Sequence, residues 1–316
     1  MGRNKHSLPF LSAATLLPAF CFSCASASFV KETAFGYGTM WTVSVYNQDQ
    51  KAAEAIATKV GETSRLCDNL ETGSSEGVKG INEGKTVKAS PFLLGALKSA
   101  LSMQERTQGY FNPFMGELSS AWLSALRQGK TLSQEEIAPM LEKAKGTTLK
   151  IEGDMVSKVG EGTLDLGGIG KGMMCDLAKE ILLDNKVTTY LVDGGKSSLL
   201  LGTSDSKGSP FSVSLPASSL KFEAKDCAIS TSSIDQQTYL VDGVKYSHIV
   251  NPVDGSAKCL YDSITVTGEK AGELDALTTA MMGMDLDKIK GFCGQFGCKI
   301  AVLKDGKALY ETLSLH

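Results

Sequence analysis

Histidine, proline and tryptophan are scarce in this sequence, which has only 3 His, 8 Pro and 2 Trp among 316 residues. With so little histidine, and no paired Cys-x-x-Cys motifs beyond the first residues, a structural zinc site is disfavoured. Long basic runs are also absent, and 32 Lys and Arg stand against 35 Asp and Glu, a formal net charge of −3. The sequence therefore lacks the basic surface of a nucleic-acid-binding protein and predicts no nucleic-acid partner.

The remaining composition is that of an ordinary globular protein. Hydrophobic residues make up 42% and charged residues 21% of the chain, which excludes the fibrous and disordered classes. The length allows one large domain or about two ordinary ones. Because no internal repeat, low-complexity tract or clear linker divides the chain, the sequence predicts one compact unit.

The first residues have the pattern of an export signal over residues 1–27. Two basic residues precede the apolar run LPFLSAATLLPAFCF, which is too short to cross a bilayer comfortably, and small residues follow it. Cleavage after Ala27 would release a soluble protein, whereas cleavage before Cys24 would leave a lipid-modified cysteine. Both remain open, and either leaves an exported domain over residues 28–316.

Six of the eight cysteines lie beyond this segment. An oxidising compartment would allow them to form disulfides, but their spacing does not determine the pairing. Buried free thiols are the alternative. These cysteines are Cys67, Cys175, Cys227, Cys259, Cys293 and Cys298.

The N-terminal half contains a strand followed mainly by helices. Residues 39–47 alternate and are rich in β-branched and aromatic side chains, which predicts a strand. Residues 51–67 and 90–106 have helical composition. Ser133 followed by Glu136 is a capping box, which predicts that a surface helix begins there.

From residue 147 onward the pattern changes to short strands and tight turns. Three dipeptides separate extended segments and predict antiparallel hairpins: Gly153-Asp154, Asp242-Gly243 and Asp305-Gly306. Helices are predicted at 173–183 and 273–282. Because strands and helices mix without a regular β-α-β alternation, the predicted fold class is α+β, with an antiparallel sheet and flanking helices.

A glycine-rich segment lies in the second half, LDLGGIGKGMMCDLAKE, residues 164–180. Glycines let backbone N–H groups approach a ligand, and a helix N-terminus favours negative charge, so a phosphate group is the natural ligand. The spacing matches neither G-x-G-x-x-G nor a P-loop, since Gly172 follows Lys171 where a P-loop has Ser or Thr. An ordinary turn is the alternative.

A carboxylate and a hydroxyl share one helix face in GELDALTTAMMGM, residues 272–284. Asp275 and Thr279 are four residues apart, so their oxygens can converge on one point. Two oxygen donors suit a hard cation such as Mg²⁺. Alternatively, the carboxylate only complements the helix dipole and the threonine bonds back to its own helix.

His248 is the only histidine between the export signal and the last residue of the chain. It lies in YSHIVNPVDG, after a predicted hairpin strand and before a turn-rich segment, where a base can be held at the rim of a site. No orienting carboxylate is visible, so the sequence does not predict a Ser/His/Asp triad. A structural histidine is the alternative.

Five blocks of the sequence occur in the order found in the ApbE-type flavin transferases, and the chain resembles that family from about Gly36 to its C-terminus. The blocks are DLGGIGKG, LVDGG, AISTSS, HIVNPVDG and LDALTTAMMGM. Several spaced blocks in one order are far more specific than a single motif. The resemblance implies a mixed α/β unit related to the T-fold and a protein exported to the periplasmic or cell-surface side. It also favours lipid anchoring through Cys24.

The resemblance further implies an FAD:protein FMN transferase, in which FAD is the substrate. A Ser or Thr hydroxyl of an acceptor protein, a redox-pump or flavin-reductase subunit, would take FMN and release AMP. Mg²⁺, or Mn²⁺, would be held by the Gly168 carbonyl, Asp275 and Thr279. His248 would take the hydroxyl proton, since histidine titrates near neutral pH. The family pattern places FAD contacts at Tyr37, Phe111, Asn112, Asp165, Lys171 and Ile249.

Three blocks depart from the family pattern. Tyr37-Gly38-Thr39 replaces Met-Gly-Thr, residues 111–114 read Phe-Asn-Pro-Phe in place of Phe-Asp-Pro-Thr, and Thr231-Ser232-Ser233 replaces Thr-Ser-Gly. Two alternative functions therefore stay open. One is an Mg²⁺-dependent FAD pyrophosphatase that uses water in place of the acceptor hydroxyl, and the other is a non-enzymatic exported flavin-binding protein.

Overall fold

The computed structural model describes residues 29–36, 38–46, 48–68, 75–235 and 237–316. The predicted export signal with Cys24 and the predicted FAD contact Tyr37 lie outside the described residues. No helix within the described ranges is long and apolar enough to cross a membrane. Cys175, Cys227, Cys259, Cys293 and Cys298 are free thiols in the described ranges, so no disulfide joins any two of these five.

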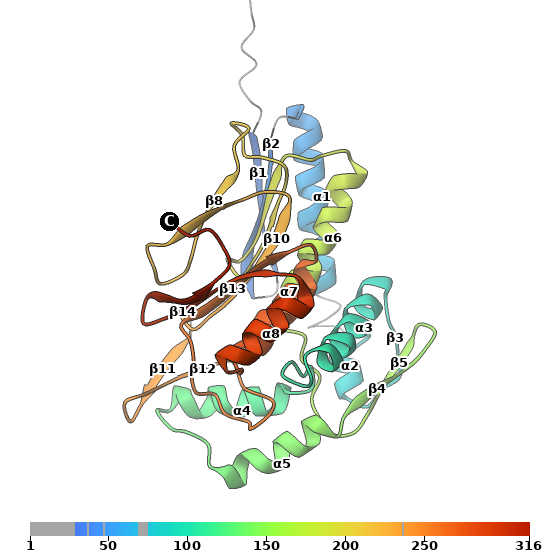
Figure 1. The fold of residues 1–316 in the computed structure, drawn as a ribbon. Helices are drawn as coiled ribbons and strands as arrows, with labels where there is room; N and C mark the ends of the chain where they lie inside the picture. The colour runs from blue at the N-terminus through green and yellow to red at the C-terminus, as the bar shows by residue number, and fades with distance from the viewer. Residues whose placement is uncertain (1–28, 37, 47, 69–74, 236) are drawn as a thin grey trace, which may run out of the picture.

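An eight-stranded sheet forms the centre of the molecule (Figure 1). Its strand order is β1-β2-β6-β7-β10-β13-β14-β15, and every neighbouring pair runs antiparallel, which confirms the predicted α+β class. The strands are β1 (Phe29–Gly36), β2 (Thr39–Tyr46), β6 (Tyr190–Gly194), β7 (Ser198–Leu201), β10 (Cys227–Ser233), β13 (Ser263–Gly268), β14 (Lys299–Lys304) and β15 (Lys307–Glu311).

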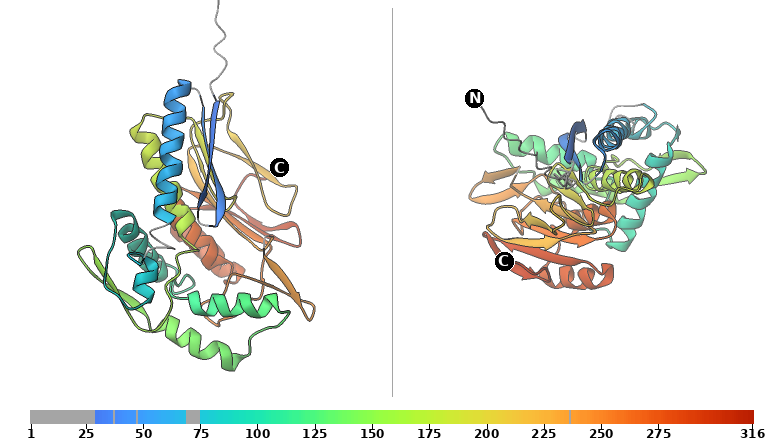
Figure 2. Two further views of the ribbon diagram at one scale, coloured as in Figure 1. Left: turned by 180° about the vertical axis from the view of Figure 1, so that it is seen from behind. Right: turned by 90° about the horizontal axis from the view of Figure 1, so that it is seen from above.

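Helices cover one face of this sheet. α1 (Gln50–Asp68) packs on β1 and β2, α6 (Gly170–Asp184) on β6 and β7, and α7 (Ala271–Met281) on β10 and β13. Figure 2 shows α1 and α6 side by side on that face. Most residues of α7 are buried, in keeping with a sequence that is apolar around nearly its whole circumference. α8 (Leu286–Phe296) follows and ends at Gly297 in the left-handed conformation.

A separate hairpin covers the opposite face of the sheet. It consists of β8 (Phe211–Ser214) and β9 (Lys221–Ala224), and Figure 1 shows it on the other side of the sheet from α1 and α6. Alternation along β8 turns Phe211 and Val213 inward, where they form a second apolar cluster with Leu201 and Leu303 of the main sheet.

The remaining elements gather at one end of the sheet (Figure 1). Helix α3 packs on α7, and helix α4 packs on both α5 and β11. The indole N–H of Trp122 in α4 also donates a hydrogen bond to the Gly255 carbonyl at 2.8 Å. These elements are α2 (Val78–Asn82), β3 (Val87–Lys88), α3 (Pro91–Arg106), α4 (Gly116–Arg127), α5 (Gln134–Lys145), β4 (Thr148–Glu152), β5 (Met155–Val159), β11 (Thr238–Val241) and β12 (Val244–Ser247).

Local signals in the sequence located several of these boundaries. Ser133 and Glu136 form the predicted capping box at the start of α5, and Ser90 caps α3 by accepting the Leu93 N–H. Each of the three predicted hairpin turns joins an antiparallel pair, β4–β5, β11–β12 and β14–β15. Helices α2, α4 and α8 were not predicted, and α6 begins three residues before the predicted start, at Gly170.

Helices α6 and α7 cross with their backbones in contact. A Cβ atom placed on Gly172 of α6 would lie 2.2 Å from the Ala271 carbonyl oxygen, and one on Gly272 of α7 would lie 2.5 Å from the Met173 sulfur. Real Cβ atoms do not come so close to other atoms. Because its clash is with backbone, position 172 needs glycine, and any side chain there would push the two helices apart, whereas the flexible Met173 side chain could move away from a Cβ at position 272.

This crossing predicts opposite effects for two helical glycines. Gly172→Ala should lower the free energy of unfolding by about 1–3 kcal/mol, because overpacking outweighs the helix propensity that alanine adds. The matched control is Gly291→Ala in α8, where a Cβ meets nothing within 4 Å and the substitution should stabilise by up to about 1 kcal/mol. Urea denaturation measures both, and equal effects would contradict the proposed close contact.

Candidate active-site cleft

One cleft of about 1070 Å³ lies where the glycine-rich turn, the α7 helix and the residues on either side of the β11–β12 hairpin meet one end of the main sheet. Its volume is slightly above the usual range of small-molecule sites, roughly 300–1,000 Å³. Every predicted site residue within the described ranges lines this cleft: Phe111, Asn112, Asp165, Gly168, Lys171, His248, Ile249, Asp275 and Thr279. The structure thus brings together side chains from four separate stretches of the sequence.

The glycine-rich segment forms a turn that leads into α6. The Asp165 carboxylate accepts the Gly167 N–H at 2.7 Å, which fixes the entry to the turn. Lys171 lies in the first turn of α6, and its ammonium donates to the Gly167 carbonyl at 3.1 Å. A cation and the positive end of a helix therefore border the same part of the cleft, which makes it favourable for an anion.

Gly168 of this turn lies against α7. A Cβ atom on Gly168 would stand 3.3 Å from the Thr279 hydroxyl oxygen and 3.1 Å from the ring of Phe111. The turn and the face of α7 that carries Asp275 and Thr279 are therefore neighbours, as the sequence required for a shared cation site. Larger residues than glycine would separate them.

Asp275 is 4% exposed and binds the first turn of α6. Its Oδ2 atom accepts the Gly172 N–H at 3.0 Å, and its Oδ1 atom accepts the Ser230 hydroxyl at 3.3 Å. The Thr279 hydroxyl donates to the Asp275 carbonyl of its own helix at 3.0 Å. This is the bond back to the helix that the sequence offered as the alternative to cation binding. That bond uses the hydroxyl proton and leaves oxygen lone pairs available to a ligand.

The oxygen atoms around Gly168 suit a hard cation. In a regular helix the Gly172 N–H would bond to the Gly168 carbonyl, four residues earlier, but here it bonds to Asp275. Within the described ranges no hydrogen bond ends on the Gly168 carbonyl oxygen. One carboxylate, one hydroxyl and one free carbonyl form a donor set of the kind that Mg²⁺ binds while it keeps water and substrate oxygens.

A second carboxylate, Asp176 of α6, holds the N-terminus of α7. Its two oxygens accept the N–H groups of Ala271 at 2.8 Å and Gly272 at 2.9 Å, which are otherwise unsatisfied at a helix start. Burial raises the pKa of Asp176, and these two N–H donors oppose the shift. Asp275 in turn caps α6, so each helix supplies the carboxylate that caps the other.

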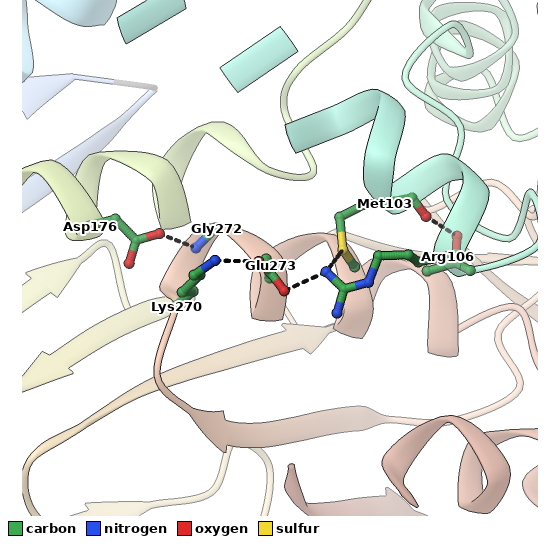
Figure 3. A network of polar contacts seen from close by, with 7 residues as sticks. Met103, Arg106, Asp176, Lys270, Gly272 and Glu273 are labelled. Atoms are coloured by element: carbon green, nitrogen blue, oxygen red, sulfur yellow. Dashed lines mark hydrogen bonds and ion pairs between the residues drawn. The ribbon is translucent and has the colours of Figure 1, made fainter. Parts of the chain in front are cut away.

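Figure 3 shows the ion pairs that continue from this contact. Arg106 of α3 donates to Glu273 at 2.6 Å, and Lys270 donates to the other Glu273 oxygen at 3.0 Å. The guanidinium of Arg106 also lies 4.3 Å from the centre of the Phe296 ring. The start of α7 is therefore attached to α3 as well as to α6, and Arg106 links α3 to α8 in turn.

Comparison with known proteins identifies the fold and the family. A model described as the ApbE family matches residues 37–303. The chain belongs to the ApbE family. An FAD:protein FMN transferase of Treponema pallidum is 23% identical over 84% of this chain and 82% of its own length. Another FAD:protein FMN transferase, from Vibrio cholerae, is 28% identical over 60% of each chain.

Two solved ApbE structures have the same fold. The ApbE protein from Thermotoga maritima has a TM-score of 0.78 and 24% identity, over 90% of this chain and 97% of its own. The flavin transferase ApbE from Vibrio cholerae has a TM-score of 0.75 and 21% identity, over 91% and 97%. The α+β architecture described above is therefore that of the ApbE family.

The resemblance to the ApbE family assigned FAD contacts to Asn112 and Phe111, but both side chains are buried and make contacts within the protein. Asn112 is buried, and its amide oxygen accepts the Phe114 N–H at 2.9 Å while its amide nitrogen reaches the Ala144 carbonyl at 3.5 Å. Phe111 is 4% exposed and packs against Gly168. Both shape the wall of the cleft. Tyr37 cannot be placed, because it lies outside the described residues.

Three residues that support the walls of the cleft, without lining it themselves, were not found by reading the sequence. The Asn82 side chain accepts the Leu164 N–H at 2.8 Å and donates to its carbonyl at 2.9 Å, which fixes the chain just before the glycine-rich turn. Ser230 contacts Asp275 from β10. Asp176 could have been noticed in the sequence, because it lies one helical turn after Gly172 and so on the same face of α6.

His248 follows β12 and lies inside the cleft with its side chain exposed to solvent. Although the residue is accessible to solvent, the surrounding protein partly desolvates its ring, which lowers the pKa of His248 from its ordinary value of 6.5, and the positive charge of Lys171 lowers this pKa further. At neutral pH the imidazole is therefore mainly uncharged. An uncharged imidazole can accept a proton from a hydroxyl group.

The effect of the Lys171 charge on the pKa of His248 can be tested by titrating the imidazole. Lys171→Met removes a cation that disfavours the imidazolium form, so the pKa of His248 should rise toward 6.5 while the effect of desolvation remains. Proton NMR of the imidazole resonances measures this shift. Lys290→Met is the control, since that ammonium lies over the Tyr310 ring, and it should leave the titration of His248 unchanged. Identical titrations in both variants would contradict the assigned electrostatic contact.

Proposed function

We propose that this chain is an FAD:protein FMN transferase, which moves FMN from FAD to a Thr or Ser hydroxyl of an acceptor protein and releases AMP. Membership of the ApbE family and the names of its curated relatives support this activity. The observation that carries it is the meeting of the glycine-rich turn with Asp275 and Thr279 in one cleft that also holds Lys171 and His248.

The diphosphate of FAD would lie on the glycine-rich turn. Backbone N–H groups at the start of α6 and the ammonium of Lys171 provide positive charge there. The glycines carry no side chain and so leave room for phosphate oxygens. Phe111 and Ile249 line the same cleft and offer apolar surface to the rest of the dinucleotide. Binding of FAD is thus expected to depend on both polar and apolar walls.

A divalent cation, Mg²⁺ or Mn²⁺, fits the free carbonyl of Gly168, the carboxylate of Asp275 and the hydroxyl of Thr279. When bound, it would neutralise negative charge on the diphosphate. Asp275 is the only one of these three ligands with a formal charge. The capping bond from Gly172 orients that carboxylate before any ligand arrives.

His248 is the proposed general base. As the acceptor oxygen forms its bond to the FMN phosphorus, the bond between that phosphorus and the AMP oxygen breaks, and the hydroxyl proton passes to the uncharged imidazole. The lowered pKa of His248 keeps it ready for this role at neutral pH. Lys171 contributes charge on the phosphate side of the cleft.

The setting of this reaction is part of the proposal. The N-terminal pattern supports an exported protein that acts on the periplasmic or cell-surface side, with a lipid at Cys24 as the anchor. Its acceptor would be a subunit of a redox pump or a flavin reductase. Labelling with a radioactive fatty acid in cells tests the anchor, since Cys24→Ala should abolish the label.

The decisive experiment is to incubate the purified domain with FAD, Mg²⁺ and an acceptor domain and then to measure the mass of the acceptor. A gain equal to FMN minus water supports the transferase. Free FMN and AMP with an unchanged acceptor would instead indicate the pyrophosphatase, and intact FAD would indicate a flavin-binding protein.

Removal of the only charged cation ligand should nearly abolish the reaction. Asp275→Asn should lower the transfer rate at least about 100-fold, because stabilisation of several kcal/mol by the cation is lost. Titration with Mg²⁺ should show a matching loss of metal affinity. Ser230→Ala is the control, since it removes one hydrogen bond to Asp275 but keeps the charge. Its rate should stay within about tenfold of the unsubstituted protein, a second-sphere effect.

Removal of the proposed base should affect chemistry and leave binding intact. His248→Asn should lower kcat for transfer by about 100-fold or more, the usual contribution of general-base catalysis, while the Kd for FAD changes little. In the unsubstituted protein the rate should fall on the acid side as His248 becomes protonated, below pH 6.5. A variant with normal kcat would exclude His248 from proton transfer.

A further inference from the structure

The cleft continues past the diphosphate site to the other face of the main sheet. Its far portion, here called the β8 arm, is lined by Leu191 of β6, Leu199 of β7 and the consecutive residues 211–216 of β8 and the turn after it. The β6–β7 turn, which includes Gly195 and Lys196, borders the cleft between the two portions. One continuous cavity therefore joins the cation and phosphate ligands to an apolar surface on the opposite face of the sheet.

Strand β8 presents a backbone edge to this arm. It pairs only with β9, so its other edge has no neighbouring strand among the described residues. Residues on both faces of the strand, Phe211 and Val213 as well as Ser212 and Ser214, line the cleft. A strand whose two faces both border one cavity must turn its edge toward it.

The register shows which backbone groups are free on this edge. The Leu215 N–H donates to the Leu220 carbonyl of the hairpin at 2.9 Å, so alternate residues of β8, among them Phe211 and Val213, direct their N–H and C=O groups toward β9. The groups of Ser212 and Ser214 then point the other way. Both serines are exposed, and no backbone hydrogen bond outside the hairpin uses them within the described ranges.

The outer edge of the same hairpin, on β9, is paired at one residue. Lys221 of β9 exchanges two backbone hydrogen bonds with His316, one in each direction and each of 3.0 Å. The C-terminus thus pairs with the outer edge of β9 at Lys221, while no backbone hydrogen bond within the described ranges uses the edge of β8 that faces the cleft. Natural proteins normally protect sheet edges, so an open edge inside a functional cleft suggests a use.

We propose that an extended segment of the acceptor protein binds as an added strand along the Ser212–Ser214 edge of β8 and so delivers its Ser or Thr hydroxyl to the diphosphate. This inference rests on the proposed transferase function, which requires a polypeptide to reach phosphorus inside the cleft. Backbone pairing supplies affinity for any sequence in such complexes, and alternate side chains supply specificity. Every second side chain of the segment would face Leu191 and Leu199, which favours small apolar residues there.

The test compares two proline substitutions that each remove one backbone N–H. Ser212→Pro removes a donor from the open edge, and Glu223→Pro removes an outward donor from β9, on the side away from the cleft. Steady-state transfer to an acceptor domain is measured along with the Kd for FAD. Ser212→Pro should lower kcat/KM for the acceptor about tenfold through KM, with Kd for FAD unchanged, while Glu223→Pro stays within about twofold.

A second measurement uses the unsubstituted protein. Hydrogen–deuterium exchange of the β8 amides should slow at least about tenfold when an acceptor peptide with its hydroxyl residue replaced by alanine is added, and should not slow with FAD alone. Equal kcat/KM in the two proline variants, protection by FAD alone, or a weaker Kd for FAD in Ser212→Pro would each overturn the inference. An unsubstituted protein that binds FAD but transfers nothing would instead overturn the transferase function itself.

Discussion

The site depends on a reciprocal pair of capping interactions between α6 and α7. Asp275 of α7 accepts an N–H from the first turn of α6, and Asp176 of α6 accepts two N–H groups from the first turn of α7. Each carboxylate satisfies donors that a helix leaves unpaired and lies at the positive end of its partner's dipole. Glycines at the crossing allow the backbones to touch, so the two helix starts are held in one arrangement.

The same interaction prepares a ligand site. Because the Gly172 N–H turns to Asp275, the Gly168 carbonyl loses its helical partner and stays free next to Thr279. A structural bond between two helices thereby leaves an oxygen free at the proposed cation site and orients the carboxylate beside it. Structural capping and cation binding are not alternatives for Asp275, since its oxygens have lone pairs for both.

The cleft reaches both faces of the main sheet, and this shape matches a reaction with two partners. The side of α6 and α7 carries charge and polar backbone groups suited to a diphosphate, whereas the side of β8 carries apolar residues and an open strand edge. A small molecule and a polypeptide need such different surfaces. The β6–β7 turn lies between them, so reactants bound on each side would meet near Lys171 and His248.

The sequence alone determined what depends on local rules. The capping box at Ser133, the hairpin turns and the alternation of β2 act over a few residues, and the glycine-rich segment and the Asp275–Thr279 pair stood out because each lies within one motif. Only the tertiary structure decided what depends on distant contacts. The pairing of Asp176 with α7, the free Gly168 carbonyl and the open edge of β8 arise where separate segments pack, and no local pattern encodes which strand or helix will be the neighbour.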